Sequence, residues 1–277
     1  MQYNEIIDKR ELAEGIKSFL VYTPWIARKA QPGQFVILRL HDKGERFPLT
    51  LCDWDGEKGW IRLVVQEVGK STRELGRMER GDCIKDILGP LGKPAHIDLF
   101  GKVICVAGGV GVAEIYPLAK SFKERGNQVI CIIGFRSQSQ LILEKELSKV
   151  VDRLVITTED GSKGEKGLVT DPLKRLLEEG ADLVYAVGPV VMMKAVSELT
   201  REFNVTTKVS LNPIMVDGTG MCGCCRVRVG GEVKFCCVEG PEFDGHLVDF
   251  EELMIRNARF KEEERVSLER FLKGERG

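Results

Sequence analysis

The stretch KVICVAGGVG, residues 102–111, decides the fold of this chain. Its first six residues are almost all apolar, which is typical of a strand buried on both faces. The glycines that follow predict a tight turn into a helix. The same rhythm continues downstream, where apolar strands alternate with helical segments. The chain therefore predicts a doubly wound parallel sheet covered by helices.

We expect five strands in this part of the chain, at residues 102–107, 129–135, 154–158, 183–187 and 205–211. We expect helices between them, one ending near Gly126 and others at residues 141–149, 171–179 and 190–203. Ligands of such sheets bind at the carboxyl ends of the strands, and four of these ends carry loop residues suited to binding. The candidates are Gly108, Gly109, Val110, Gly111, Gly134, Arg136, Glu159, Asp160, Gly161, Gly188 and Pro189. This edge of the sheet is the predicted nucleotide site.

The glycine turn is not a complete dinucleotide fingerprint. Its third glycine is missing, because position 114 is Glu. The second strand ends in Phe135 and Arg136, so no acidic residue stands there to hold a ribose. In dinucleotide-binding folds an acidic residue at this place holds the ribose of NAD, and an arginine accommodates the phosphate of NADP, so Arg136 favours NADP.

Upstream, residues 1–99 contain short strand-like runs separated by turn residues. We expect strands at residues 19–23, 34–40, 60–68 and 83–87, which predict a small barrel. Two motifs stand out in it. In the first, Arg46 offers a fork of donors for a pyrophosphate, followed by Pro48, Leu49 and Thr50. The second is GKST, whose hydroxyls and helix N-terminus suit a phosphate; its residues are Gly69, Lys70, Ser71 and Thr72.

The segment DGTGMCGCCRVRVGGEVKFCC, residues 217–237, holds five of the nine cysteines. Cysteines this dense indicate a metal centre. Asp217, Cys222, Cys225 and Cys237 form the frame D-x4-C-x2-C-x11-C. Plant-type [2Fe–2S] sites use C-x4-C-x2-C and a distant fourth cysteine, so this frame has Asp in the first position. The segment therefore predicts a [2Fe–2S] cluster.

Three alternatives remain open for this segment. Asp217 is a turn residue in one of them, and Cys224 or Cys236 is then the fourth cluster ligand. In the second, Cys222, Cys225 and two further cysteines hold a structural zinc ion. In the third, the cysteines are inert buried thiols.

Composition narrows the class of partner. The 277 residues carry 41 basic and 42 acidic side chains, a balance that argues against nucleic acid or a membrane surface as the main partner. Residues 1–8 show no targeting pattern, and no apolar run is long enough for a membrane span. We expect a cytoplasmic protein, in which clustered cysteines indicate metal or redox chemistry.

In this order the motifs resemble the ferredoxin reductase superfamily, in which a flavin barrel precedes a pyridine-nucleotide domain. The resemblance makes residues 46–50 and 69–72 the FAD motifs and residues 108–111 the nicotinamide-nucleotide loop. It implies NAD(H) rather than NADP. The implied domains are an FAD-binding β-barrel at 1–99, an NAD(H)-binding α/β domain at 100–211, and a [2Fe–2S] module with a helix at 212–277. Glu114 departs from the family, because many members carry an early proline there and this chain has Pro117.

Nearly the whole chain is similar to the electron-transfer subunit of dihydroorotate dehydrogenase. Asp217 and the run TEDGSKGEKGLVT, residues 158–170, resemble more closely the small subunit of NADH-dependent reduced ferredoxin:NADP+ oxidoreductases, also called the sulfide dehydrogenase beta subunit. That resemblance implies a heterodimer with a larger subunit that carries a bifurcating flavin and [4Fe–4S] clusters and reacts with ferredoxin. The charged and apolar residues of 248–273 predict an amphipathic helix broken near Asn257, packed on its own domain or docked on the partner.

We therefore expect an electron-transfer flavoprotein. Nicotinamides move two electrons together and clusters move one, so a flavin is needed between them. No side chain is expected to act as an acid or base, and Thr50 with the loop at 108–111 is expected to hold the nicotinamide against the flavin. The alternatives are the dihydroorotate dehydrogenase subunit, a diaphorase without a partner, and a nucleotide-binding assembly protein with a zinc knuckle.

Overall fold

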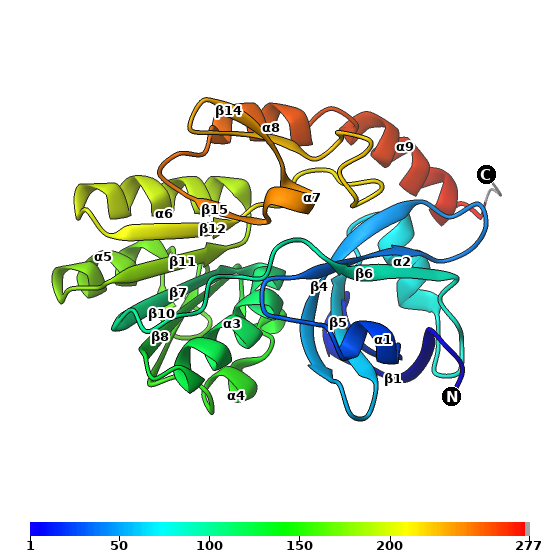
Figure 1. The fold of residues 1–277 in the computed structure, drawn as a ribbon, viewed down its shortest axis with the longest axis horizontal. Coiled ribbons are helices and arrows are strands. Elements are labelled where there is room, and N and C mark those ends of the chain that lie inside the picture. Colours follow the sequence, from blue (N-terminus) through cyan, green and yellow to red (C-terminus); the bar gives the residue numbers. More distant parts are fainter. Residues whose placement is uncertain (275–277) are drawn as a thin grey trace.

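Two main sheets lie side by side, and the cysteine segment with two helices runs across one end of both (Figure 1). The description rests on a computed structural model in which residues 1–274 are defined. The N-terminal third forms the antiparallel sheet, and the middle of the chain forms the parallel one.

The antiparallel sheet has six strands in the order β1-β2-β5-β4-β3-β6. Their bounds are β1 Glu5–Ala13, β2 Ile16–Tyr22, β3 Phe35–Arg39, β4 Arg46–Asp55, β5 Trp60–Gln66 and β6 Asp86–Leu91, with helices α1 Pro24–Ala27 and α2 Lys70–Arg77. A bridge between Glu5 and Cys83 joins β1 to the segment before β6, so the sheet closes on itself. Its interior is apolar, with Phe19, Leu38 and Leu63 wholly buried. The expected barrel is therefore present.

Strand β1 was not expected from the sequence. Its residues EIIDKRELA are mostly charged, and only Ile6 is fully buried, so the alternation of polar and apolar residues is weak. Pairing with β2 makes it a strand. The last barrel strand was expected at residues 83–87 and lies at Asp86–Leu91, because Cys83 and Ile84 bond to the start of β1 instead.

The second sheet has the order β10-β9-β8-β7-β11-β12-β15. Its strands are β7 Lys102–Gly108, β8 Gln128–Phe135, β9 Arg153–Thr158, β10 Glu165–Lys166, β11 Leu183–Val187, β12 Thr206–Ser210 and β15 Glu242–Asp244. Its helices are η1 Gly109–Gly111, α3 Val112–Glu124, η2 Gln138–Gln140, α4 Glu144–Leu147, α5 Thr170–Glu178 and α6 Val190–Glu202. All pairs are parallel except the pair of β12 and β15. Strand β15 follows the cysteine segment in the chain, and its pairing joins that segment to the sheet.

Helix α4 is shorter than the expected helix at residues 141–149. Leu143 has a left-handed backbone (φ 57°), which a helix cannot contain, so the helix begins only at Glu144. Apolar residues of 141–149 are still buried, which is why the sequence pattern looked helical.

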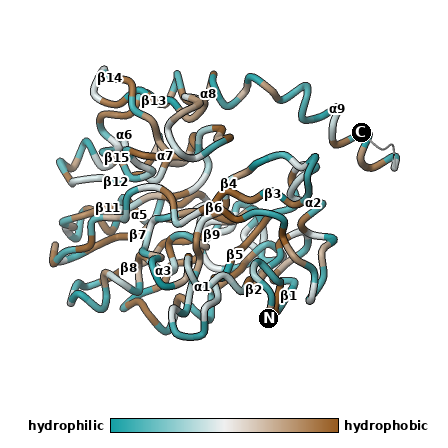
Figure 2. Tube along the Cα trace, turned by 45° about the vertical axis from the view of Figure 1, so that its right-hand side comes forward, coloured by the Kyte–Doolittle hydropathy of each residue, from teal (hydrophilic) through white to brown (hydrophobic). Residues whose placement is uncertain are grey.

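The cysteine segment leads into the hairpin β13 Arg226–Val229 and β14 Glu232–Phe235, then α7 Cys236–Glu239. Helices α8 Phe250–Asn257 and α9 Lys261–Leu272 follow, so the break expected near Asn257 is confirmed. Helix α9 buries no residue and extends toward the barrel, where Arg77 of α2 stacks on Phe271 with 4.1 Å between guanidinium carbon and ring centre. Apolar residues concentrate in the strands, whereas α9 is largely hydrophilic (Figure 2). None of the helices in residues 1–274 combines the length and apolar character needed to cross a membrane.

Candidate functional site

The loops expected to bind the nucleotide meet at one edge of the parallel sheet. Gly108 lies beside Gly134 in the register of β7 and β8, and Gly134 lies beside Thr157 of β9. On the other side, Val187 of β11 lies beside Ala107. The structure therefore brings together the four strand ends that the sequence singled out.

Several glycines of this edge are required by packing. A Cβ atom on Gly111 would stand 2.6 Å from the carbonyl oxygen of Val187, and one on Gly134 would stand 2.4 Å from a methyl group of Val169. Both distances are too short for any side chain. Close packing alone thus accounts for these two glycines, whether or not a nucleotide binds beside them.

The loops after β8 and β9 are tied to each other. The backbone N–H of Asp160 donates to the carbonyl of Arg136 at 3.2 Å. The Asp160 carboxylate accepts from the hydroxyl and the backbone N–H of Ser162, at 2.6 and 2.9 Å, and these bonds lower the pKa of Asp160. Glu159 and Gly161 flank it on the surface. Arg136 is therefore held near an anionic loop at the sheet edge.

The first barrel motif lies on β4 and faces the parallel sheet. Arg46 is exposed, and Pro48, Leu49 and Thr50 are half-buried. The hydroxyl of Thr50 donates to Glu114 Oε2 of α3 at 3.1 Å. The motif therefore lies at the junction between the barrel and the helix that follows the glycine turn.

The second barrel motif is at the start of α2, as expected, but its hydroxyls bond elsewhere. The backbone N–H of Gly69 donates to Thr72 Oγ1 at 2.9 Å, and the Ser71 hydroxyl donates to Glu45. Both hydroxyls thus have protein partners in this structure, and the phosphate site stays a prediction. The backbone N–H groups of the first helical turn, beginning at Lys70, are further candidate donors for a phosphate.

The start of the cysteine segment is ordered by Asp217. Its two carboxylate oxygens accept from the backbone N–H groups of Thr219 at 2.9 Å and Cys222 at 2.8 Å, and these bonds lower its pKa. Gly218 and Gly220 have left-handed φ values of 73° and 85°, which let the loop turn this tightly. Asp217 and Cys222 are thus neighbours.

Cys225 and Cys237 form a second pair of neighbours, both buried. The backbone N–H of Cys237 lies 3.4 Å from Cys225 Sγ. Burial raises the pKa of the Cys237 thiol to about 12, with smaller contributions from Cys225 and from the negative charge of Asp217. A Cβ atom on Gly220, between Asp217 and Cys222, would stand 3.2 Å from methyl groups of Val238, which follows Cys237, so the two pairs lie close to each other.

The rival ligands are placed differently. The Cys236 thiol is fully buried and donates to the carbonyl of Leu211 at 3.4 Å, so it faces the apolar core. Cys224 is half-buried beside Arg256, which donates to its carbonyl at 3.0 Å. Cys236 is therefore a poorer candidate for the fourth ligand than Asp217 or Cys224.

The donor set fits a two-iron cluster better than one zinc ion. A [2Fe–2S] cluster divides its four ligands into two pairs, one for each iron, and this segment offers one carboxylate–thiol pair and one thiol–thiol pair. A structural zinc ion needs four ligands around one centre. Within residues 1–274, no three His, Cys, Asp or Glu side chains converge in that way.

The cysteine segment packs directly on the barrel. A Cβ atom on Gly218 would stand 2.7 Å from side-chain carbons of Ile37 in β3 and Leu91 in β6. Just after β6, the backbone N–H of Lys93 donates to the carbonyl of Gly240 at 2.7 Å. All three candidate sites therefore meet around one side of the barrel.

The sequence interpretation assigned no role to Glu114, which was noted only as a departure from the family. The structure buries this carboxyl against Thr50. A charged residue inside the apolar face VAEIYPLA of a helix was the only sign of it in the sequence.

Comparison with known proteins agrees with this arrangement. Residues 105–198 match the oxidoreductase NAD-binding domain, and residues 212–249 match the iron–sulfur cluster binding domain of dihydroorotate dehydrogenase B. A homolog of the dihydroorotate dehydrogenase B (NAD(+)) electron transfer subunit from Thermotoga maritima is 50% identical over 98% of this chain and 96% of its own. The corresponding subunit of Geobacillus thermodenitrificans is 33% identical over 86% and 94%.

Solved structures of oxidoreductases are also similar to this chain. A structure of the NADH-dependent reduced ferredoxin-NADP oxidoreductase, described in connection with flavin-based electron bifurcation, superimposes with a TM-score of 0.94. It is 49% identical and covers 98% of this chain and 99% of the other. A cytochrome P450 reductase from Amycolatopsis shares the fold at 20% identity, with a TM-score of 0.63 over 72% and 65% of the two chains.

The fold and the two matched domains define an electron-transferring oxidoreductase with a ferredoxin reductase-like architecture. The chain belongs to the family of dihydroorotate dehydrogenase B electron-transfer subunits. The expected fold class and electron-transfer function are confirmed. FAD, a [2Fe–2S] cluster and NAD(H) are the cofactors that the matches and the fold support. The domain boundaries, the individual ligands and the cytoplasmic location stay predictions.

Proposed function

We propose that this chain is the small subunit of a heterodimer of the NADH-dependent reduced ferredoxin:NADP+ oxidoreductase type. In this proposal it moves electrons between NAD(H) and a larger subunit, through FAD and a [2Fe–2S] cluster. The observation that carries it is the meeting of the three sites around the barrel. Thr50 contacts the nucleotide helix at Glu114, and Gly218 of the cysteine segment packs on Ile37 and Leu91.

Each site has a defined task in this proposal. The barrel, residues 1–99, holds FAD with Arg46, Pro48, Leu49 and Thr50, and with the backbone of Gly69, Lys70, Ser71 and Thr72. Bound FAD supplies a group that accepts a hydride and gives up electrons one at a time. Residues 100–211 hold NAD(H) at the strand ends, and residues 212–277 hold the cluster through Asp217, Cys222, Cys225 and Cys237. The residues of the chain position NAD(H), FAD and the cluster next to one another.

The exit for electrons is the exposed surface of the cysteine segment. Met221, directly before Cys222, is 89% exposed, and Val238, directly after Cys237, is 39% exposed. Apolar side chains beside a redox centre suit a docking surface. We infer that a larger flavin and [4Fe–4S] subunit covers them and passes electrons to ferredoxin, in keeping with the oxidoreductase structure that this chain matches.

The second candidate is service to a dihydroorotate dehydrogenase. It is favoured by relatives of that name that are 33–36% identical to this chain and by the 50% identical homolog from Thermotoga maritima. The 49% identical solved structure carries the other description. The two candidates differ in the partner and share the chemistry inside this chain.

Isolation of the native complex tests the proposal. We expect the chain to co-purify with a flavin and [4Fe–4S] subunit and to bind two irons and one FAD. The complex should catalyse NADH-dependent reduction of NADP+ by reduced ferredoxin. A dihydroorotate-oxidising partner would support the second candidate. Zinc without iron, or a colourless protein that does not react with NADH, would overturn both.

A further inference from the structure

Glu114 is an ionisable side chain buried at the junction of the barrel and the parallel sheet. It lies in the first turn of α3 and is 6% exposed. Thr50 donates to its Oε2 atom at 3.1 Å, and within residues 1–274 its Oε1 atom has no hydrogen-bond partner. A buried carboxyl with a free oxygen is costly, because burial penalises the charged form. Packing alone gives no reason for an acid here.

The surroundings favour a bound proton on Glu114. Burial, with a smaller contribution from the negative charge of Glu242 in β15, raises its pKa to about 7. The hydroxyls of Ser210 in β12 and Thr50 in β4 oppose this only in part. A carboxyl with a pKa near neutrality takes up and releases protons readily at physiological pH.

Further polar groups lie on the neighbouring strands β11 and β15 of the parallel sheet. Tyr185 of β11 is fully buried, and its hydroxyl has no hydrogen-bond partner within the described residues. Burial raises the pKa of Tyr185 well above its ordinary value, and the negative charges of Glu242 and Glu114 add to this. Glu242 is half-buried, and burial raises its pKa, whereas the His96 backbone N–H, Lys208 and Tyr185 lower it.

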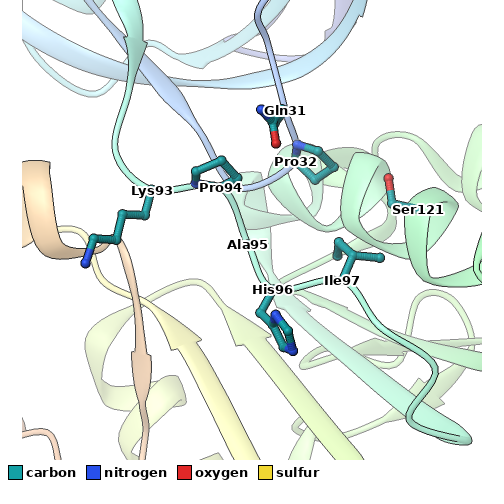
Figure 3. A pocket seen from close by; sticks show the side chains of 8 residues that line it. All are labelled: Gln31, Pro32, Lys93, Pro94, Ala95, His96, Ile97 and Ser121. Atoms are coloured by element: carbon teal, nitrogen blue, oxygen red, sulfur yellow. The ribbon is translucent and has the colours of Figure 1, made fainter.

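Glu242 is hydrogen-bonded to a residue that lines an open pocket. The backbone N–H of His96 donates to Glu242 Oε2 at 3.2 Å. His96 lies on the connection between barrel and parallel sheet, where it lines an open pocket with Lys93, Ile97 and Ser121 (Figure 3). The register of β12 and β15 pairs Ser210 with Glu242, and the Ser210 hydroxyl acts on Glu114. These residues therefore lie between the predicted flavin motif at Thr50 and the His96 pocket.

The proposed function creates a need for such a path. A hydride brings two electrons and one proton to the flavin, whereas an iron–sulfur cluster removes electrons only. For each pair of electrons that leaves through the cluster, one proton must leave the flavin by another route. Catalysis in the reverse direction requires one proton to enter.

We propose that Glu114 is the group that accepts this proton, through Thr50, and releases it toward Glu242 and the His96 pocket. The carboxylate becomes a carboxylic acid when it takes the proton and is restored when the proton is released. This inference rests on the proposed function, since it requires FAD beside Thr50. It also assigns an acid–base role where the sequence interpretation expected none.

The test compares Glu114→Gln with Glu114→Asp and with Glu124→Gln, an exposed glutamate at the end of the same helix. Each is measured in the intact complex by rapid mixing. We expect Glu114→Gln to bind FAD fully and to be reduced by NADH at the wild-type rate. Electron transfer from flavin to cluster should slow on the order of 100-fold, with loss of the solvent deuterium effect. Glu114→Asp should recover part of the rate, and Glu124→Gln should match the wild type.

A second measurement uses the wild-type chain and needs no turnover. Infrared difference spectra of protein labelled with 13C-glutamate should show a carboxylic acid band that changes when the bound flavin is reduced, and this band should be absent from Glu114→Gln. Unchanged rates and spectra in a variant that is replete with FAD would overturn the inference and leave the proposed function standing. A wild-type chain that binds no FAD would overturn both.

Discussion

The backbone N–H of Cys237 points at the sulfur of Cys225, 3.4 Å away, although the two residues are separated by eleven others. The hairpin β13–β14 accounts for this, because it pairs Arg226 with Phe235 and so returns the chain to its starting point. The x11 spacing of the cysteine frame is therefore the length of one hairpin. It places the last cysteine beside the third.

Replacement of Asp217 tests whether it is a cluster ligand. We expect Asp217→Cys to keep two irons per chain and to change the electron paramagnetic signal of the reduced cluster, because thiolate replaces a harder carboxylate. We expect Asp217→Ala to lose most of the iron.

The control for this test is Asp55→Ala in the barrel. Asp55 also accepts backbone N–H bonds, from Glu57 and Lys58, but it lies far from the cysteines in the sequence. Iron content that stays complete in Asp217→Ala would show that Asp217 only shapes the turn, and Cys224 would become the leading fourth ligand.

Single cysteine replacements separate ligands from core residues. We expect Cys236→Ala to keep its iron, because the Cys236 thiol faces the core and bonds Leu211. The change removes a buried sulfur and should lower stability by about 1–2 kcal/mol. Cys225→Ala, made as the matched change in a neighbouring buried thiol, should lose the cluster. Iron analysis and thermal unfolding of both variants decide the matter, and iron loss from Cys236→Ala would contradict the assignment.

Gly69→Ala tests the phosphate site at the start of α2. Gly69 has an ordinary φ of −132°, and a Cβ atom there would meet nothing within 4 Å. The fold therefore does not require glycine. We expect the apoprotein to unfold at the wild-type temperature, whereas FAD binding weakens roughly tenfold because the methyl group crowds a phosphate at the helix end. Unchanged FAD affinity in a flavin titration would show that no phosphate of FAD binds at this turn.

Gly111→Ala, unlike Gly69→Ala, should destabilise the fold. Its Cβ atom would stand 2.6 Å from the Val187 carbonyl oxygen, so the loop between β7 and α3 must shift. We expect a loss of about 1–3 kcal/mol in the free energy of unfolding, together with a raised KM for NADH. Thermal unfolding of the apoprotein and steady-state kinetics measure the two effects, and a variant with wild-type stability would show that the loop yields without strain.

The sequence was sufficient for the architecture, because buried parallel strands and glycine turns have strong local patterns. It located the strand ends that meet at Gly108 and Gly134 without any structure. It failed where tertiary contacts override local pattern. The charged segment β1 is a strand because it pairs with β2, which its own residue pattern does not predict. Glu114 was missed for the same reason, because its partner Thr50 is 64 residues away.

The pH dependence of apoprotein stability tests the state of Glu114 without any cofactor. Its folded pKa of about 7 lies above the ordinary value of 4.5, so between these values the folded chain holds a proton that the unfolded chain has released. Stability must then fall as pH rises from about 4.5 to 7, by up to about 3 kcal/mol from this group.

Glu114→Gln removes the ionisation and should abolish that part of the decline. We therefore expect the free energy of unfolding of the variant, relative to that of the wild type, to be higher at pH 8 than at pH 5 when both are measured by urea unfolding. The carboxyl groups whose pKa values are lowered, such as Asp152, contribute equally to both proteins and cancel in the comparison. Glu124→Gln, exposed on the same helix, should follow the wild type at both values. Parallel curves for Glu114→Gln and the wild type would mean that Glu114 is charged at neutral pH, and so unable to hold a proton there.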